Sequence, residues 1–211
     1  MTVKVIVTDM DGTFLDDAKQ YDRDRFMAQF AQLRQRDIEF VVASGNQYYQ
    51  LISFFPDIAH EIAFVAENGG WVVSAGDDVF NCQLPKEHFH TVIEYLQMLS
   101  DIEIIACGKR SAYTLNGYND ELKTVAAKYY HRLQLVDDFN HIDDVILKFG
   151  LNVPDQLIPQ IQPQLHAALG DMVTAVATGY GSIDLIIPGV HKANGLRILQ
   201  QRWGIENHEV V

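Results

Sequence analysis

The sequence predicts an α/β fold in which a Rossmann-like parallel sheet is interrupted by an inserted α+β module. Short apolar runs at 3–8, 39–43 and 62–66 alternate with helical patterns, the order typical of a parallel sheet with crossover helices. From about residue 84 the order changes, and strands follow one another as in antiparallel pairing. We therefore expect a core formed by residues 1–83 and 184–211, and a separate α+β domain over 84–183.

The first part of the core carries the alternating elements. Asp22 can cap a helix in which Phe26, Phe30 and Leu33 recur at helical spacing. After the strand at 39–43, a helix over about 47–55 is ended by Pro56. Following the strand at 62–66, residues 67–80 predict a hairpin with a Gly-Asp turn.

The inserted module begins with an amphipathic helix over 85–99, whose apolar side chains form one stripe. Its remaining expected elements, in chain order, are strands at 103–106 and 112–115, a helix near 121–130, a strand near 145–153, a helix near 155–169 and strands near 172–177 and 183–187. The chain then returns to the core with a helix after Lys192. Residues 209–211 predict the start of a further strand.

Composition limits the classes of partner. The chain has 211 residues and 48% hydrophobic content, enough to bury a sizeable core. Its net charge of -12 argues against nucleic acid or an anionic membrane, because the long-range field would repel both. Cys82 and Cys107 predict reduced thiols rather than a disulfide framework. No apolar leader or stretch of about 18 apolar residues is present, so we expect a cytoplasmic protein.

The segment that carries chemistry is Asp-Met-Asp-Gly-Thr at residues 9–13, directly after the first apolar run. A parallel strand would deliver both carboxylates to the edge where open α/β sheets place their ligands. One carboxylate can attack phosphorus, while the other gives a proton to the leaving oxygen and later takes one from water. Gly12 permits a backbone path close to a phosphate. The alternative is an acidic turn without chemistry.

Two further segments can handle a phosphoryl group. The Ser44 hydroxyl and the amides of Gly45 and Asn46 could bind a phosphoryl oxygen at a helix N-terminus. The alternative for Ser44 is an ordinary helix N-cap. Lys192, which opens the last helix, can neutralise charge on a transferred phosphoryl group. The alternative interpretation is that Lys192 is a solvated surface lysine without a role at the site.

These three segments resemble the first three motifs of the haloacid dehalogenase (HAD) superfamily, and the position of the insert resembles its Cof-type members of subclass IIB. The residues of these motifs are most similar to those of bacterial sugar phosphatases. This resemblance implies a phosphatase for small phosphorylated metabolites, with sugar phosphates foremost. It implies Asp9 as the nucleophile that forms an aspartyl-phosphate and Asp11 as general acid and base. Mg²⁺ would lie between the Asp9 carboxylate, the Asp11 backbone carbonyl and the phosphate.

By the same resemblance, the phosphate-binding residues would be Met10, Gly12, Ser44, Gly45, Asn46 and Lys192. Asn46 stands where many relatives have arginine, so a guanidinium contact is not expected. The inserted domain would close over the site and select the leaving group. The family's fourth motif, which supplies another metal-binding carboxylate, would follow Val211. The resemblance therefore implies either a truncated product of a longer enzyme or a naturally short form whose metal site is impaired. In both cases we expect an exposed sheet edge through which the chain could self-associate.

Several alternatives stay open. The chain could bind phosphate without turnover, or act on flavin mononucleotide or pyridoxal phosphate; a phosphomutase ranks lower. Asn68 is a candidate for substrate contact or a plain turn residue. His88 and His90, two positions apart on a helix, do not face each other, so a metal pair is not expected. We expect Tyr48 and Tyr49 in the core and rim rather than as a base-stacking platform.

Overall fold

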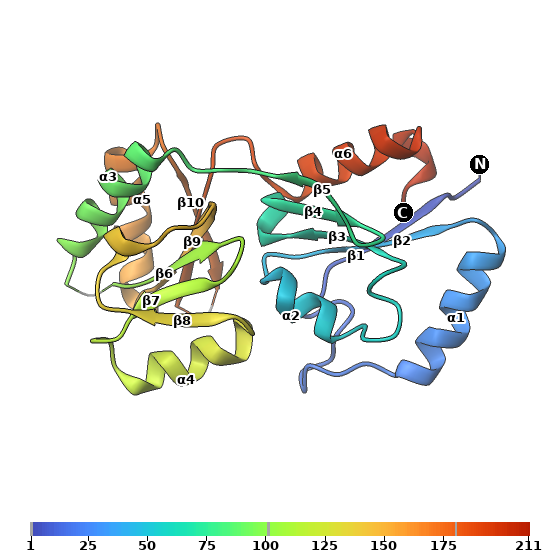
Figure 1. The fold of residues 1–211 in the computed structure, drawn as a ribbon, viewed down its shortest axis with the longest axis horizontal. Coiled ribbons are helices and arrows are strands. Elements are labelled where there is room, and N and C mark those ends of the chain that lie inside the picture. The colour runs from blue at the N-terminus through green and yellow to red at the C-terminus, as the bar shows by residue number, and fades with distance from the viewer. Residues whose placement is uncertain (1, 101, 180) are drawn as a thin grey trace. The chain divides into compact units, whose positions relative to one another are not determined.

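The computed structural model describes residues 2–100, 102–179 and 181–211 (Figure 1). The chain forms two compact units, one of Met1–Asn81 with His191–Val211 and the other of Cys82–Val190. Within the described part of the chain, no helix is long and apolar enough to cross a membrane. The expected return to the core at residue 184 is wrong. The strand Ser182–Ile186 pairs along its length inside the second unit, so the core resumes only at His191.

The core unit contains a five-stranded sheet in the order β1 to β5. Its strands are β1 (Val5–Thr8), β2 (Glu39–Ala43), β3 (Ala63–Ala66), β4 (Trp71–Ser74) and β5 (Asp77–Asn81). The first three strands are parallel, and β4 and β5 are antiparallel to their neighbours.

Of the strand predicted at 209–211, Val210 forms an isolated parallel bridge to β1, and Glu209 ends a short 3-10 helix (Asn207–Glu209). Val210 bridges Val5, and the Val7 amide donates to the Val211 carbonyl at 2.7 Å. β1 therefore has β2 on one side and this C-terminal segment on the other. Strand order reverses at β1, which is the place where open α/β sheets bind ligands.

Helices cover both faces of the core sheet (Figure 1). On one face, α1 (Arg23–Gln35) and the segment of α2 (Tyr48–Ser53) with the residues that follow it bring aromatic side chains onto the strands. The rings of Phe26 and Phe40 lie 5.0 Å apart, and those of Phe55 and Phe64 lie 6.3 Å apart. On the other face, Leu199 of α6 (Lys192–Trp203) packs with the valines of the strands. Burial of each such side chain stabilises the fold by roughly 1.5–3 kcal/mol.

Close packing of α6 depends on Gly195. A Cβ at this position would lie 2.4 Å from the Val65 Cγ1 atom, so only glycine lets the first turn of α6 approach the sheet so closely. The approach fixes the N-terminus of α6 against β3 and β4. Lys192 begins this helix, so its backbone position follows from the same contact.

The turns on either side of β4 use positive φ angles. Between β3 and β4, residues Glu67, Asn68 and Gly69 have φ values of 50°, 59° and 96°. In the hairpin of β4 and β5, Ala75 and Gly76 have φ values of 49° and 83°. The predicted turn at Gly76 and Asp77 is therefore wrong by one residue, because the two turn residues are Ala75 and Gly76. Two-residue hairpin loops favour positive φ at both central positions.

The second unit is a six-stranded sheet in the order β10-β11-β9-β6-β7-β8. In chain order its elements are α3 (Lys86–Gln97), β6 (Glu103–Gly108), β7 (Ala112–Leu115), α4 (Asp120–Tyr129), β8 (Leu133–Val136), β9 (Ile146–Asn152), α5 (Ile158–Leu169), β10 (Thr174–Gly179) and β11 (Ser182–Ile186). Among the described strands of this unit, β7 and β8 alone pair in parallel. The α+β character of the insert is confirmed, while β8 was not predicted.

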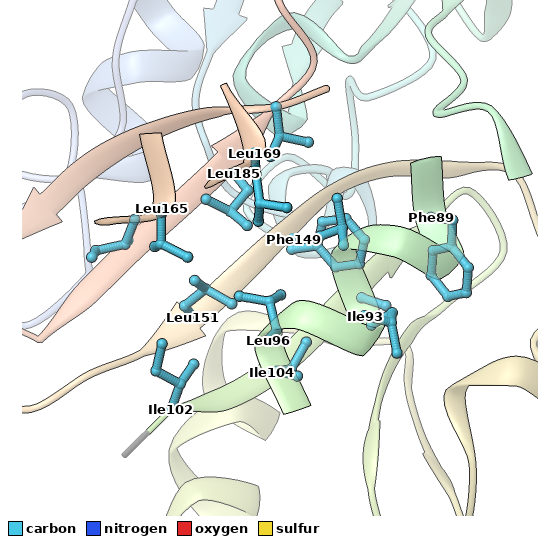
Figure 2. Packing of buried hydrophobic residues seen from close by; sticks show 14 of the residues in the cluster. Phe89, Ile93, Leu96, Ile102, Ile104, Phe149, Leu151, Leu165, Leu169 and Leu185 are labelled. Atoms are coloured by element: carbon cyan, nitrogen blue, oxygen red, sulfur yellow. The ribbon is translucent and has the colours of Figure 1, made fainter. Parts of the chain in front are cut away.

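One face of this second sheet carries the main apolar core of the unit. Leu96 of α3 and Leu165 of α5 belong to one buried cluster with Phe149, Leu151 and Leu185 of the strands (Figure 2). The helical stripe predicted for residues 85–99 is thus confirmed.

A buried carboxylate organises the turn that joins β6 to β7. The Asp144 side chain is only 2% exposed and accepts hydrogen bonds from the backbone of Arg110 and the Tyr113 hydroxyl, at 2.8 and 3.0 Å. Burial first, and then the hydrogen bond to Asp144, raise the pKa of Tyr113 to about 12.

Candidate active site

Asp9 directly follows β1 and contacts Lys192 at the start of α6. The Lys192 Nζ atom lies 3.0 Å from Asp9 Oδ1, and the two side chains are 37% and 45% exposed. The same Asp9 oxygen accepts the Met10 backbone N–H at 2.8 Å. Asp9 is therefore accessible to a ligand and lies beside a cation that the fold delivers from the opposite end of the core sequence.

The position of Lys192 is determined by the residues around it. His191 caps α6, because its Nδ1 accepts the Asn194 backbone N–H at 3.3 Å. A Cβ on Gly69 would lie 2.4 Å from the His191 carbonyl oxygen. The turn after β3 therefore packs directly on the backbone that leads into Lys192, and a glycine is needed there.

Met10 takes part in the turn after β1 through its backbone rather than through its side chain. The side chain is fully buried, at 0% exposure. Its carbonyl accepts N–H groups from Thr13, Phe14 and Leu15 at 3.3, 3.1 and 2.9 Å. Gly12, at φ 70°, allows this tight turn. A Cβ at Gly12 would meet nothing within 4 Å, so its requirement is conformational rather than spatial.

Asp11 is held by two donors. Asn46 Nδ2 donates to Asp11 Oδ2 at 2.9 Å, and Lys19 Nζ donates to Asp11 Oδ1 at 2.7 Å. The structure thus brings Asn46, predicted to bind phosphate, onto the second carboxylate of the motif. Lys19 was missed by the sequence analysis. Asp16, a residue type typical of the first position of a turn, was the available signal.

Ser44 lies between β2 and α2, but it is not the N-cap of a helix. α2 begins at Tyr48 and its N-cap is Gln47, so Ser44 to Asn46 precede the helix instead of capping it, and the alternative of an N-cap role for Ser44 is wrong. Phosphate binding by Ser44 to Asn46 stays a prediction. These residues form a turn. The Ser44 hydroxyl, on a residue that is 2% exposed, accepts the Asn46 N–H at 3.1 Å. As a hydroxyl it also keeps a proton that it can donate to a phosphoryl oxygen.

This turn is tied to the turn after β3. The Asn68 N–H donates to the Ser44 carbonyl and the Glu67 N–H donates to the Asn46 carbonyl, both at 3.1 Å. A Cβ on Gly45 would lie 2.8 Å from Asn68 Oδ1, so the Asn68 side chain lies directly over Gly45. The candidate substrate residue Asn68 is therefore next to the predicted phosphate-binding turn.

The donor set of the site fits Mg²⁺. The Asp9 carboxylate and the Asp11 backbone carbonyl are hard oxygen ligands, and Mg²⁺ is commonly held by one or two carboxylates together with substrate phosphate and water. Across residues 2–100, 102–179 and 181–211, no group of three or more His, Cys, Asp and Glu side chains is positioned to hold a metal. Any cation here would thus depend on oxygen atoms of the substrate as well.

The α/β fold, the inserted α+β unit and the paired carboxylates at the strand-order reversal define a phosphohydrolase of the α/β class. The chain belongs to the haloacid dehalogenase-like hydrolases, because the model of that family matches residues 6–211.

Individual relatives agree with this assignment. The chain is 65% identical to the 5-amino-6-(5-phospho-D-ribitylamino)uracil phosphatase YbjI of Escherichia coli (strain K12), over its whole length and 78% of the relative. The crystal structure of SMU.1108c from Streptococcus mutans UA159 has a TM-score of 0.94 and 32% identity, covering 100% of this chain and 80% of that one. The subclass IIB sugar phosphatase BT4131 shares the fold, with a TM-score of 0.77, 12% identity and coverage of 99% and 79%. The resemblance to Cof-type HAD phosphatases is confirmed.

Proposed function

We propose that this phosphatase is Mg²⁺-dependent and hydrolyses phosphate monoesters carried on the sugar or sugar-alcohol chain of small metabolites. The observation that carries the proposal is the pairing of Asp9 with Lys192 at 3.0 Å, beside an Asp11 that is held separately by Asn46. Two carboxylates in different surroundings are what a nucleophile and a proton-transfer group require.

In the first half-reaction, an Asp9 oxygen attacks phosphorus and the ester P–O bond breaks. The electron pair of that bond goes to the leaving oxygen, which takes the proton of Asp11. Lys192 and the Ser44 hydroxyl stabilise the charge on the phosphoryl oxygens. The product is an aspartyl-phosphate at Asp9, with Asp11 left as a carboxylate.

In the second half-reaction, Asp11 takes a proton from water as the water oxygen attacks phosphorus. The bond between Asp9 and phosphorus breaks, and its electron pair returns to the Asp9 carboxylate. Inorganic phosphate leaves and Asp11 is protonated again. The carboxylate of Asp9 and the backbone carbonyl of Asp11 would hold Mg²⁺, which when bound neutralises charge on the phosphoryl group.

The substrate class is supported by the relative from Escherichia coli. Its name specifies a phosphate at the end of a ribityl chain that also bears a uracil ring. Flavin mononucleotide carries the same phosphoribityl group, so both compounds present a primary alkyl phosphate. We rank the ribitylaminouracil phosphate first, followed by simple sugar phosphates, flavin mononucleotide and pyridoxal phosphate.

The experiment is phosphate release across these four substrate types, with and without Mg²⁺, by the wild-type chain and by Asp9→Asn and Asp11→Asn variants. Release that requires Mg²⁺ and Asp9 supports the proposal. Saturable phosphate binding without release by the wild-type chain would instead support the alternative of binding without turnover. Release that persists in Asp9→Asn would overturn the assignment of the nucleophile.

Two further expectations stay predictions. A cytoplasmic location rests on the sequence alone. Self-association through the edge of the core sheet is tested by sedimentation of the purified chain, where a single monomeric species would contradict it.

A further inference from the structure

We propose that Asn68 contacts the substrate directly, by donating a hydrogen bond from its side-chain amide to an oxygen of the phosphoryl group. This inference rests on the proposed function and deepens it, because it adds a further side chain to Ser44 and Lys192 in stabilising the phosphoryl oxygens. The observation that suggests it is the place of Asn68 in the turn after β3, where the neighbouring residues contact the segments that carry Ser44 and Lys192.

Backbone hydrogen bonds join the turn after β3 to the segment that carries Ser44. The Ser44 N–H donates to the Val65 carbonyl at 2.9 Å, and the Asn68 N–H donates to the Ser44 carbonyl at 3.1 Å. The Glu67 N–H donates to the Asn46 carbonyl at 3.1 Å. Because both segments supply donors, the position of Asn68 relative to Ser44 is fixed by backbone contacts rather than by flexible side chains.

On its other side in the chain, Asn68 is followed by a residue that contacts the segment of Lys192. A Cβ on Gly69 would lie 3.2 Å from the Lys192 amide nitrogen, so the two backbones are in close contact. The Lys192 Nζ atom in turn lies 3.0 Å from Asp9 Oδ1. Contacts to Ser44 and to Lys192 thus flank Asn68, and these are the two residues proposed to bind the oxygens of a phosphoryl group that Asp9 attacks.

The backbone of this turn has an uncommon conformation. Glu67, Asn68 and Gly69 have successive φ values of 50°, 59° and 96°. Side chains other than glycine rarely adopt positive φ, although asparagine does so more readily than most. Residues held at such angles persist where the surrounding structure determines them, and they cluster at ligand sites. The conformation of this turn therefore agrees with a role in presenting Asn68 to a ligand.

The side chain of Asn68 lies over Gly45 and is accessible. A Cβ on Gly45 would lie 2.8 Å from Asn68 Oδ1 and 3.4 Å from Asn68 Nδ2, so the amide lies directly against this glycine. Glu67 is only 1% exposed and Gly69 is buried, whereas Asn68 and Gly45 are partly exposed. A substrate can therefore reach the amide of Asn68 beside the turn that carries the Ser44 hydroxyl.

The chemistry of the amide fits a phosphoryl group. The oxygens of a phosphate monoester dianion only accept hydrogen bonds, and the Nδ2 atom of asparagine carries two N–H donors. Since Oδ1 is the atom of the amide nearest to Gly45, Nδ2 is the end that meets an acceptor. A contact to the phosphoryl oxygens does not depend on the leaving group, so it should form with every substrate and with inorganic phosphate.

The test measures the binding of inorganic phosphate by calorimetry in the presence of Mg²⁺, together with kcat/KM for p-nitrophenyl phosphate and for the best alkyl phosphate of the substrate panel. Asn68→Gly removes the amide and accepts the positive φ. We expect phosphate to bind about tenfold more weakly and kcat/KM to fall by the same factor on both substrates, the scale of one hydrogen bond to a charged group. Asn68→Asp places a carboxylate beside the phosphoryl oxygens and should weaken phosphate binding by at least about 100-fold.

A double-mutant cycle separates direct contact from an effect through the neighbouring turn. If Asn68 acts only by holding Ser44 in place, Asn68→Gly has no further effect on phosphate affinity once Ser44→Ala has removed the hydroxyl. Direct contact predicts a further loss of about tenfold in the Ser44→Ala background, because the amide donates to the ligand itself. Asp37→Gly is the matched control. It removes an exposed side chain at φ 52°, in the turn between α1 and β2, and should leave phosphate affinity and both kcat/KM values unchanged.

Wild-type phosphate affinity in both Asn68 variants would overturn the contact and leave the phosphatase proposal intact. A loss on only one of the two substrates, or no further loss in the Ser44→Ala background, would contradict it as well. If the wild-type chain binds phosphate but shows no Asp9-dependent release, the proposed function fails alone, and the binding comparison still decides the contact. Absence of both release and phosphate binding would overturn the two together. If urea unfolding shows that Asn68→Gly does not fold, the comparison rests on Asn68→Asp, which keeps the size of the side chain.

Discussion

Replacing Gly69 by alanine should damage catalysis from outside the candidate site. The new Cβ would lie 2.4 Å from the His191 carbonyl oxygen and 3.2 Å from the Lys192 amide nitrogen. Ordinary contact begins near 3.4 Å, so the backbone before α6 must move by about 1 Å, the difference between 3.4 and 2.4 Å. That backbone carries Lys192, whose Nζ is 3.0 Å from Asp9.

Two costs add in this variant. Alanine at φ 96° is disfavoured by about 1–2 kcal/mol, and forcing atoms into a packed site adds about 1–3 kcal/mol. A displacement of about 1 Å at a catalytic group can lower the rate by up to about 10²-fold. We therefore expect Gly69→Ala to unfold at lower urea concentration and to lose about 10- to 100-fold in kcat.

Gly76→Ala is the matched control. Gly76 has φ 83°, but a Cβ there would meet nothing within 4 Å. This variant has the backbone cost without the displacement, so it should lose stability and keep wild-type kcat. Equal kcat values in the two variants, each measured while fully folded, would refute the proposed link between the turn after β3 and Lys192.

Three further predictions concern stability. The neutral Tyr113 phenol donates a hydrogen bond to Asp144, and the pKa of Tyr113 is raised to about 12. The contribution of this hydrogen bond to the free energy of unfolding should therefore be complete below the ordinary phenol pKa near 10 and be lost as the pH rises to about 12. Tyr113→Phe should flatten this part of the curve of unfolding free energy against alkaline pH. The hydrogen bond from Lys4, followed by that from the Glu206 N–H, lowers the pKa of Glu209. The pairing of residues 209–211 with β1 should therefore be strongest above the ordinary Glu pKa and weaken as the pH falls through the lowered pKa of Glu209. The exchange rate of the Val211 amide hydrogen, compared between wild type and Glu209→Gln across this pH range, measures the strength of the pairing. Phe64→Ala, at a fully buried position in the aromatic face of the core, should cost about 3–5 kcal/mol in urea unfolding, and a loss below about 1 kcal/mol would contradict the packing described.

Local sequence signals predicted the elements that depend on local chemistry. Asp22 was expected to cap a helix, and its side chain accepts the Arg25 N–H at 3.0 Å. The apolar run before Asp9 forms β1 between two parallel neighbours, which places the carboxylates at the reversal of strand order. A buried strand and a cap each have a signature of a few consecutive residues, so both could be found without an alignment.

The features that were missed depend on contacts between distant residues or on backbone angles. β8 has four residues, with Gln134 and Leu135 exposed, so it lacks the apolar run of a buried strand and is defined by pairing with β7. Asn46 was interpreted through its neighbours in sequence, whereas its amide contacts Asp11, 35 positions away. The Lys19 contact requires a positive φ that no side-chain pattern indicates.

The paths by which the chain enters and leaves the second unit have a consequence for folding kinetics. The Leu84 N–H donates to the Ile146 carbonyl at 2.9 Å, and Ile186 of β11 is in register with Lys148 of β9. Both ends of the insert therefore lie beside the same stretch of β9. Closing a long flexible loop has an entropic cost that grows with the logarithm of its length. Once the second unit has folded, the connection between β5 and α6 behaves as a short loop. The core can then assemble as if its segments before and after the insert were nearly continuous in sequence.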